Sequence, residues 1–285
     1  MTRILITGAN GYIGRHVINA LSKDMHWEIT ATDLTFKDGW GDKISFVEGD
    51  ILALSQHKDL YDRLNRPEVC IHLAWKDGFT HNASSHIDCL PAHFNFLQNL
   101  VEHGCKQLVV AGSFREYGPC NGCVSEDHPL VAENYYAWAK ISLYQLLEIY
   151  LHNKTVILQW LRFFTPYGDD EHNNSILSKI IRWEAEGKQF FPFTEGKEQY
   201  DFIHVDELAR QIVAIASQTE ITGAINCCSG KPSKLKDKVE ELLRKGNFKI
   251  RPQYGAFPTR QYDSSVIYGD NTKVQMILKT YEKKL

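Results

Sequence analysis

The stretch Thr7-Gly8-Ala9-Asn10-Gly11-Tyr12-Ile13-Gly14 decides how the chain folds, because its glycines recur every third residue between two regular segments. The apolar run Ile4-Leu5-Ile6 before it predicts a buried strand, and the apolar spacing of residues 12–21 after it predicts a helix. Glycines in such a turn permit close approach of the backbone to a pyrophosphate, and the helix N-terminus supplies amide groups to it. The sequence therefore predicts a dinucleotide-binding loop, whose contact residues are Gly8, Asn10, Gly11, Tyr12, Ile13 and Gly14.

Strands and helices alternate along the chain from this loop to about residue 162. Strand-like runs are expected at 28–33, 44–47, 69–73, 108–111 and 156–161, and helical periodicity at 54–64, 95–102 and 135–150. This rhythm is typical of a parallel sheet covered by helices on both faces. The predicted fold class is therefore α/β, a Rossmann-type doubly wound parallel sheet, with a smaller α/β C-terminal lobe where the rhythm loosens.

Composition excludes several classes of protein. The chain has 285 residues, of which 43% are hydrophobic and 24% charged, as in an ordinary globular protein. A net charge of −3 argues against nucleic-acid partners, because phosphate backbones select strongly basic surfaces. No apolar run approaches the roughly 20 residues that span a bilayer, and the N-terminus has no signal-peptide pattern. We therefore expect no membrane association and a cytoplasmic location.

The seven cysteines are scattered, which does not favour a disulfide framework. Cys120-Asn121-Gly122-Cys123 is a C-x-x-C, but a loop turn at Asn121-Gly122 explains its spacing. A redox pair or half of a zinc site is the alternative, for which the sequence offers no second pair of ligands nearby. We expect no metal.

A carboxylate follows the second predicted strand, where the ribose of a dinucleotide is expected. Asp33 lies 19 residues after the last glycine of the loop and is placed to accept hydrogen bonds from the adenosine ribose hydroxyls. Its charge repels a 2′-phosphate and favours NAD, although Lys37 and Arg15 leave NADP as an alternative. Asp50 and Ile51, after the third predicted strand, are expected at the adenine edge, and the alternative for Asp50 is a turn cap.

A tyrosine and a lysine four residues apart form the candidate proton-transfer pair. If Tyr136-Ala137-Trp138-Ala139-Lys140 is helical, Tyr136 and Lys140 share one face, and the ammonium lies beside the phenol and lowers its pKa. Ser113 lies 23 residues before Tyr136, at the end of the fifth predicted strand. Hydride transfer from an alcohol needs a base on its hydroxyl, and the reverse reduction needs an acid there. A surface helix pair and a strand-end serine are the alternatives.

Taken together, these motifs resemble the extended short-chain dehydrogenase/reductase family, in the group that modifies nucleotide-diphosphate sugars. The matches keep the family's order along nearly the whole chain: the glycine stretch, His72-Leu73-Ala74, Ala111 to Gly118, Tyr136 with Lys140, Asp201 to Asp206, and Asp270 to Lys273.

The resemblance implies roles for these residues. Leu73 and Ala74 line the cofactor, Tyr136 gives or takes a proton at a sugar oxygen, and Ser113 hydrogen-bonds the same oxygen. Lys140 lowers the pKa of the tyrosine and holds the nicotinamide ribose. It also implies an NAD(P)-binding Rossmann domain at 1–162 with about 201–220, and a nucleotide-sugar substrate lobe at 163–200 and 221–285.

Departures from the family pattern narrow the reaction. Dehydratases of the family carry an Asp-Glu pair directly after the serine position, where this chain has Phe114 and Arg115, which disfavours dehydration. Thr165 replaces an asparagine near the phosphates, whereas Arg260 matches an arginine that clamps the diphosphate. The implied substrate-binding set is Ser113, Phe114, Thr165 and Arg260. His81, His86 and His93 are expected to be satisfied or exposed, with a place in the substrate cleft as the alternative.

Three reactions fit the predicted site. The favoured one is reduction of a nucleotide-linked 4-keto-6-deoxysugar, or the reverse oxidation at C4, because bulky Phe114, Trp75 and Trp138 near the cleft oppose rotation of a sugar. The alternative is an NAD-dependent nucleotide-sugar 4-epimerase, and a non-catalytic nucleotide-binding regulatory protein is less favoured. By resemblance we expect a homodimer in which the helices around 95–103 and 136–150 pack across a two-fold axis; the alternative is that these faces are solvated.

Overall fold

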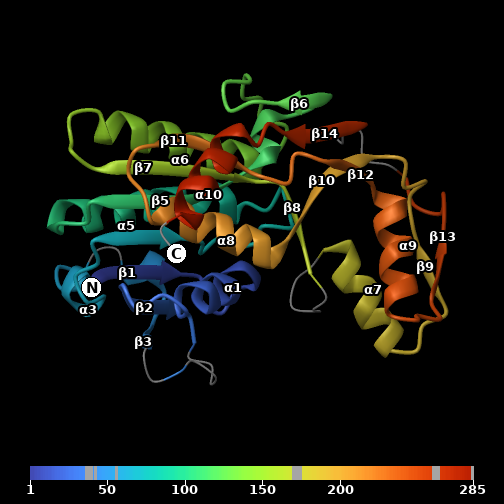
Figure 1. Cartoon of the computed structure of the whole chain (residues 1–285), viewed down its shortest axis with the longest axis horizontal. Coiled ribbons are helices and arrows are strands. Elements are labelled where there is room, and N and C mark those ends of the chain that lie inside the picture. Colours follow the sequence, from blue (N-terminus) through green and yellow to red (C-terminus); the bar gives the residue numbers. More distant parts are fainter. Residues whose placement is uncertain (36–40, 42–43, 55–56, 169–174, 259–263, 284–285) are drawn as a thin grey trace.

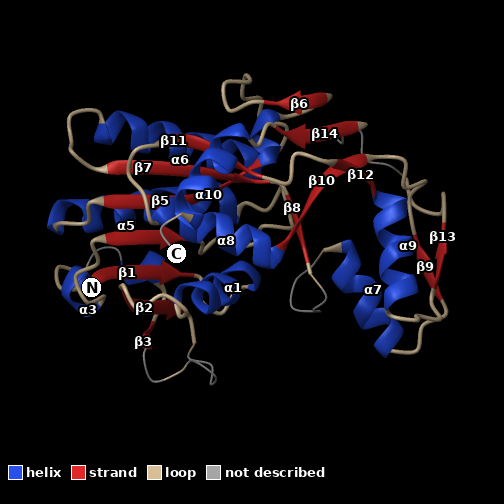
Figure 2. Ribbon diagram, viewed as in Figure 1, coloured by secondary structure: helices blue, strands red, loops and turns tan. Residues whose placement is uncertain are grey.

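A parallel sheet of seven strands forms the larger part of the molecule (Figure 1; Figure 2). The computed structural model describes residues 1–35, 41, 44–54, 57–168, 175–258 and 264–283. Across the sheet the strand order is β11-β7-β5-β4-β1-β2-β3. The strands are β1 (Thr2–Thr7), β2 (Trp27–Asp33), β3 (Ile44–Glu48), β4 (Val69–His72), β5 (Gln107–Ser113), β7 (Ile157–Phe163) and β11 (Gly223–Cys227).

The direction of winding reverses between β1 and β4, and this point positions the site. From β1 the chain runs outward to β2 and β3, and then returns to place β4 on the other side of β1, with every pairing parallel. At such a reversal the connections leave the two carboxyl ends in opposite directions and open a crevice between them. The glycine loop follows β1, and Leu73 and Ala74 follow β4, so both border that crevice.

Helices cover both faces of the sheet through two separate apolar cores. On one face lie α1 (Tyr12–Leu21), α8 (Val205–Ala216) and α10 (Thr272–Glu282), whose buried side chains join those of β1, β2 and β7. On the other face lie α3 (Leu60–Arg63), α5 (Leu90–His103) and α6 (Tyr135–Leu151). The predicted α/β doubly wound class is therefore confirmed. No helix in the described ranges is both long and apolar enough to cross a bilayer.

A second sheet lies beside the carboxyl edge of the first and carries the C-terminal lobe (Figure 1). Its strands are β6 (Gly122–Val124), β8 (Thr165–Tyr167), β10 (Gln199–His204), β12 (Pro232–Lys234) and β14 (Val266–Gly269). Beyond it, α7 (Ile176–Ala185) and α9 (Leu235–Lys245) pack with the two-stranded sheet of β9 (Phe190–Pro192) and β13 (Arg251–Gln253).

The C-terminal part of the chain differs from the predicted division. Residues 221–285 were assigned to the substrate lobe, yet β11 extends the main sheet by pairing with β7, and α10 packs on α8. The reason is that a five-residue edge strand gives little periodic signal, while Val274, Ile277 and Leu278 read equally well as the core of a lobe helix. We therefore propose that 221–228 and 270–283 belong with the nucleotide-binding domain.

The structure does not contain the single helix expected at 54–64. Two short helices, α2 (Ile51–Leu54) and α3, take its place. Leu60, Tyr61 and Leu64 give the helical spacing, but one turn suffices to bury them against α5.

Candidate active site

The glycine loop presses its backbone directly against the end of β4. Gly8 has a φ of +69°, and a Cβ placed on it would lie 2.8 Å from the amide nitrogen of Ala74. A Cβ on Gly14 would meet the carbonyl oxygens of Gly8 and Ala9. A side chain at either position therefore requires the backbone to move, which explains why glycine stands at both.

The start of α1 is arranged to receive an anion. Its N-cap, Gly11, has no side chain to accept the first amides, and the first turn carries no acidic residue. Among the described residues, nothing hydrogen-bonds the buried Oδ1 of Asn10. Free amides at a helix N-terminus, together with the positive end of the helix dipole, suit a pyrophosphate.

Asp33 reaches the loop from the end of β2. Its carboxylate accepts hydrogen bonds from the backbone amides of Asn10 and Leu34, both at 2.8 Å. This fixes the carboxylate beside the loop and leaves further lone pairs for ribose hydroxyls. Asp50 caps α2 by accepting from the Leu52 amide at 2.9 Å, the turn-cap geometry, and Ile51 is buried behind it.

Ser113 and Tyr136 meet at the carboxyl edge of the sheet. Ser113 ends β5, and Tyr136 stands in the first turn of α6, which Asn134 caps by accepting from the Ala137 amide at 2.9 Å. The Ser113 side chain lies close enough to the Tyr136 phenol to lower its pKa, against the larger effect of burial. Burial raises the pKa of Tyr136 to about 12.

Lys140 does not lie beside the phenol as the spacing predicted. Its Nζ donates to the carbonyl oxygen of Ala111 at 2.7 Å and lies 3.5 Å from the centre of the Trp75 ring, against 5.9 Å from that of Tyr136. An indole face attracts an ammonium that burial has stripped of water. Burial lowers the pKa of Lys140 to about 7. The expected lowering of the tyrosine pKa is therefore not seen, because desolvation of the phenol dominates.

Three histidines, two of which pack on Trp75, lie next to Tyr136 and Lys140 and are hydrogen-bonded. His86 receives the indole N–H of Trp75 at 3.1 Å, and His93 stacks on the same indole with ring centres 4.4 Å apart. His72 bridges His93 and the Thr7 hydroxyl. Burial lowers the pKa of His93 to about 3. Burial likewise lowers the pKa of His72, so His72 and His93 are neutral, and all three imidazoles are hydrogen-bonded.

The structure describes three of the four predicted substrate residues, Ser113, Phe114 and Thr165. Phe114 stacks on Phe164 with ring centres 5.5 Å apart and borders a shallow hollow with Arg115, Asn134 and Tyr200. Thr165 begins β8 and is half-buried. Arg260 and Lys37 lie outside the described residues. Trp138, on α6, has 45% of its surface exposed.

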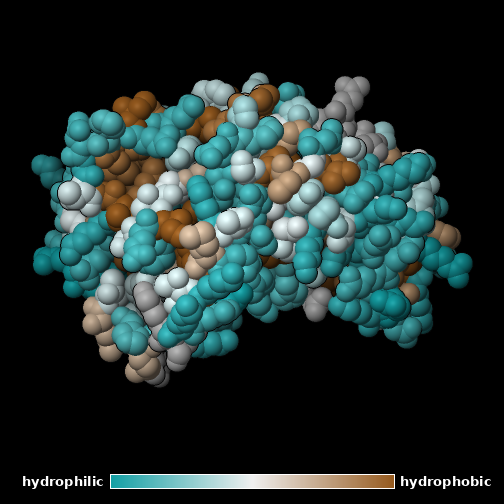
Figure 3. Space-filling model, turned by 45° about the horizontal axis from the view of Figure 1, so that its top comes forward, coloured by the Kyte–Doolittle hydropathy of each residue, from teal (hydrophilic) through white to brown (hydrophobic). Residues whose placement is uncertain are grey.

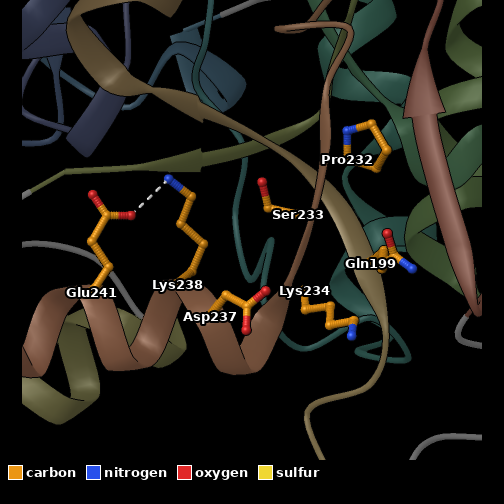
Figure 4. A pocket seen from close by; sticks show the side chains of 7 residues that line it. All are labelled: Gln199, Pro232, Ser233, Lys234, Asp237, Lys238 and Glu241. Atoms are coloured by element: carbon orange, nitrogen blue, oxygen red, sulfur yellow. Dashed lines mark hydrogen bonds and ion pairs between the residues drawn. The ribbon is translucent and has the colours of Figure 1, made fainter.

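A larger hollow lies in the C-terminal lobe, separate from these residues (Figure 4). It has a volume of about 290 Å³, and Lys238 and Glu241, which both rise from α9, form an ion pair at 3.2 Å at its edge. The other lining residues are Gln199, Pro232, Ser233, Lys234 and Asp237. None of the predicted site residues borders it.

Two buried charged residues next to Ser113 were missed from the sequence. Glu116 and Arg162 form an ion pair at 2.9 Å, with side chains 0% and 2% exposed. A sequence signal for Glu116 was present. Ser113-Phe114-Arg115-Glu116 has the spacing of a capping box, which predicts that the glutamate reaches back to the serine amide.

Comparisons with known proteins define the class of this site. The sequence model of the NAD dependent epimerase/dehydratase family matches residues 4–228. The chain belongs to this family. Its predicted family group, its enzymatic nature and NAD as its cofactor are thereby confirmed.

Individual relatives differ in closeness. The dTDP-6-deoxy-L-talose 4-dehydrogenase (NAD(+)) of Aggregatibacter actinomycetemcomitans is 39% identical over 268 residues, covering 93% of this chain and 98% of that protein. The UDP-glucose 4-epimerase of Bacillus subtilis (strain 168) is 26% identical over 254 residues, covering 78% and 75%. The solved structure of MoeE5 in complex with UDP-glucose and NAD shares the fold, with a TM-score of 0.83, 24% identity, and coverage of 97% and 92%.

Proposed function

We propose that this chain is an NAD-dependent oxidoreductase that transfers hydride at C4 of a nucleotide-linked 6-deoxysugar, oxidising the alcohol or reducing the 4-ketone. The observation that carries the proposal is the match to the 6-deoxytalose 4-dehydrogenase, which extends over almost the whole length of both chains. The substrate named for that relative is a dTDP-linked 6-deoxyhexose, and its C4 carbinol has the chemistry that Ser113 and Tyr136 suit.

The proposed cofactor site follows from the loop geometry. The amides at the start of α1 hold the pyrophosphate, Asp33 holds the adenosine ribose, and Leu73 and Ala74 line the crevice with the rest of the loop. NAD supplies the hydride acceptor when it is bound. Asp50 and Ile51 are proposed at the adenine edge.

The proton-transfer step uses two side chains of this chain, Tyr136 and Ser113. During oxidation, Tyr136 as phenolate takes the proton of the C4 hydroxyl, while Ser113 donates a hydrogen bond to the same oxygen. During reduction, the phenol returns that proton to the developing alkoxide. Lys140, whose Nζ lies 5.9 Å from the centre of the Tyr136 ring, is proposed to hold the nicotinamide ribose beside this pair. Phe114, Thr165 and Arg260 are proposed to contact the nucleotide sugar.

The test is a cofactor balance. The purified protein is incubated with NAD and dTDP-6-deoxy-L-talose, and separately with NADH and a nucleotide 4-keto-6-deoxysugar, while NADH absorbance is followed and the sugar products are identified. We expect one cofactor converted for each sugar. Tyr136→Phe serves as the control, which should lose turnover by about 100-fold or more while keeping its affinity for NAD.

The 4-epimerase is the second candidate, because the B. subtilis epimerase matches three quarters of the chain. It would appear in the same assay as interconversion of two sugars on retained NAD with no net change in NADH. That result overturns the dehydrogenase proposal.

A homodimer through α5 and α6 is proposed from an apolar stripe on α6. Trp138, Leu146 and Ile149 are 45%, 40% and 75% exposed and recur at helical spacing on one face. Apolar side chains gather in Figure 3 toward the end of the molecule where α5 and α6 lie in Figure 1. A cytoplasmic location stays a prediction.

A further inference from the structure

A buried carboxylate lies one turn after Ser113 and holds its backbone. Glu116 is 0% exposed, and its Oε1 accepts from the Ser113 amide at 2.7 Å. The Ser113 hydroxyl in turn accepts from the Arg115 amide at 3.2 Å, which completes a capping box around η1 (Phe114–Tyr117). The two bonds fix both the main chain and the side chain of Ser113.

Two residues of β7 complete the coordination of this carboxylate. Trp160 donates its indole N–H to both carboxylate oxygens at 3.0 Å, and Arg162 donates Nε to Oε2 at 2.9 Å. Gly112 makes the arrangement possible, because a Cβ there would lie 2.7 Å from Oε1 of Glu116 and would clash with the indole. The carboxylate therefore accepts hydrogen bonds from Ser113, Trp160 and Arg162.

The Arg162 guanidinium carries the network toward the second sheet. Its Nη1 donates to the Tyr117 hydroxyl at 3.1 Å and to the Glu126 carbonyl at 2.9 Å. The Tyr117 hydroxyl donates to Oδ1 of Asn226 in β11 at 2.6 Å. The hydrogen bonds that hold Ser113 therefore belong to a network that joins β5, β7 and β11.

Stability alone does not account for this pair. Taking two charges out of water costs about as much as their attraction returns, and apolar residues of similar volume often replace such a pair without loss. The negative charge of Glu116 also acts on the proton-transfer residues. It raises the pKa of Lys140, against the effect of burial, and it raises the pKa of Tyr136, in the same direction as burial. The pair is buried directly behind Ser113, whose backbone amide donates to Glu116.

We propose that Glu116 is a positioning residue for the reaction, with Arg162 as its counter-charge. Its carboxylate holds Ser113 so that the hydroxyl meets both the Tyr136 phenol and the substrate oxygen. This rests on the proposed function, since it assigns Ser113 to the C4 oxygen.

The central variant removes both charges at once. Glu116→Met/Arg162→Met leaves no lone buried charge, so we expect the fold to be retained, but the Ser113 amide loses its acceptor. We expect kcat to fall about 10- to 100-fold, the effect of one unmade charge-assisted hydrogen bond, with the Kd for NAD changed less than two-fold. Glu116→Gln/Arg162→Gln restores an acceptor oxygen and is expected to recover most of kcat.

Three further measurements separate positioning from a structural role. In a Ser113→Ala background, the double Met substitution should cost less than three-fold in kcat, because both act through the same hydroxyl. Glu116→Asp keeps the charge but shortens the reach by one methylene, and should lower kcat about tenfold with the NAD Kd unchanged. Glu207→Gln/Arg210→Gln, which removes the exposed ion pair on α8, should leave kcat within two-fold.

The proposal is overturned if the double Met variant keeps kcat within two-fold of the wild type, or if it costs the same factor with and without Ser113. If the double Met variant does not fold, Glu116→Asp decides by the same criterion. Hydrogen exchange at the Ser113 amide, measured without substrate, should accelerate at least tenfold in the double Met or the Asp variant. Unchanged exchange also overturns it, independently of whether the C4 reaction is correct.

Discussion

Replacing Lys140 with methionine should stabilise the cofactor-free protein while it abolishes turnover. The Lys140 side chain is 3% exposed, and burial lowers its pKa from 10.5 to about 7. At about 1.4 kcal/mol per pH unit, keeping this lysine buried costs the folded state about 4 kcal/mol at pH 7.5. The hydrogen bond to Ala111 and the contact with the Trp75 ring return about 2 kcal/mol. The expected net gain for Lys140→Met is about 2 kcal/mol.

The sign of the pH dependence follows from the direction of the shift. Between pH 7 and 10.5 the unfolded chain carries a proton on this amine that the folded chain has lost, so stability increases as pH rises through that window. Below pH 7 the cost is complete, and above 10.5 it vanishes. Lys140→Met should therefore exceed the wild type most at pH 6 to 7 and lose this advantage at about pH 9, where the remaining cost of burial equals the contacts that the variant lacks.

The assay is thermal unfolding of the cofactor-free proteins by circular dichroism between pH 6 and 10. We expect the variant to melt about 4 to 6 °C higher at pH 7.5, and kcat to fall about 100-fold or more. Lys154→Met, at an exposed lysine after α6, is the control and should leave the pH dependence unchanged. A variant that melts below the wild type at pH 7.5, or whose stability depends on pH as the wild type does, refutes the reasoning.

Three further substitutions test the loop, the ribose contact and the dimer. Gly8→Ala places a Cβ at positive φ against the Ala74 amide, so calorimetry should show NAD binding weakened about tenfold or more; an affinity within two-fold of the wild type contradicts the loop assignment. Asp33→Asn removes the charge that opposes a 2′-phosphate, and the ratio of Kd values for NADP and NAD should fall by about tenfold; an unchanged ratio shows that Asp33 does not select the cofactor. Ile149→Glu puts a charge on the exposed stripe of α6, and light scattering should show a monomer with the wild-type circular dichroism spectrum; a dimer that persists excludes this face.

The sequence predicted the first half of the fold better than the second for a physical reason. In the first half, β1, β4 and β5 are mostly buried, largely apolar runs, so periodicity and length identify them. After Phe163 the strands shorten to three to six residues, and β8 and β12 contain proline. Short edge elements depend on long-range pairing, which a local pattern does not contain.

The site shows the same limit at the level of single side chains. The spacing of Tyr136 and Lys140 correctly predicted a shared helix, but it did not include Trp75, which comes from the end of a different strand and draws the ammonium toward its ring. The partner of Glu116 is likewise 46 residues away in the chain. The pairing of β5 with β7 brings Glu116 and Arg162 together, and no local sequence pattern contains that pairing.

The late position of β11 and α10 has a consequence for synthesis on the ribosome. Until residue 227 emerges, β7 is an open edge of a parallel sheet, and until α10 emerges the part of α8 on which α10 packs stays uncovered. Open strand edges and uncovered apolar faces are the surfaces through which nascent chains aggregate. The growing chain is therefore most exposed to aggregation after its cofactor-binding half is already made, and a truncation before Thr272 should give insoluble protein rather than a smaller active enzyme.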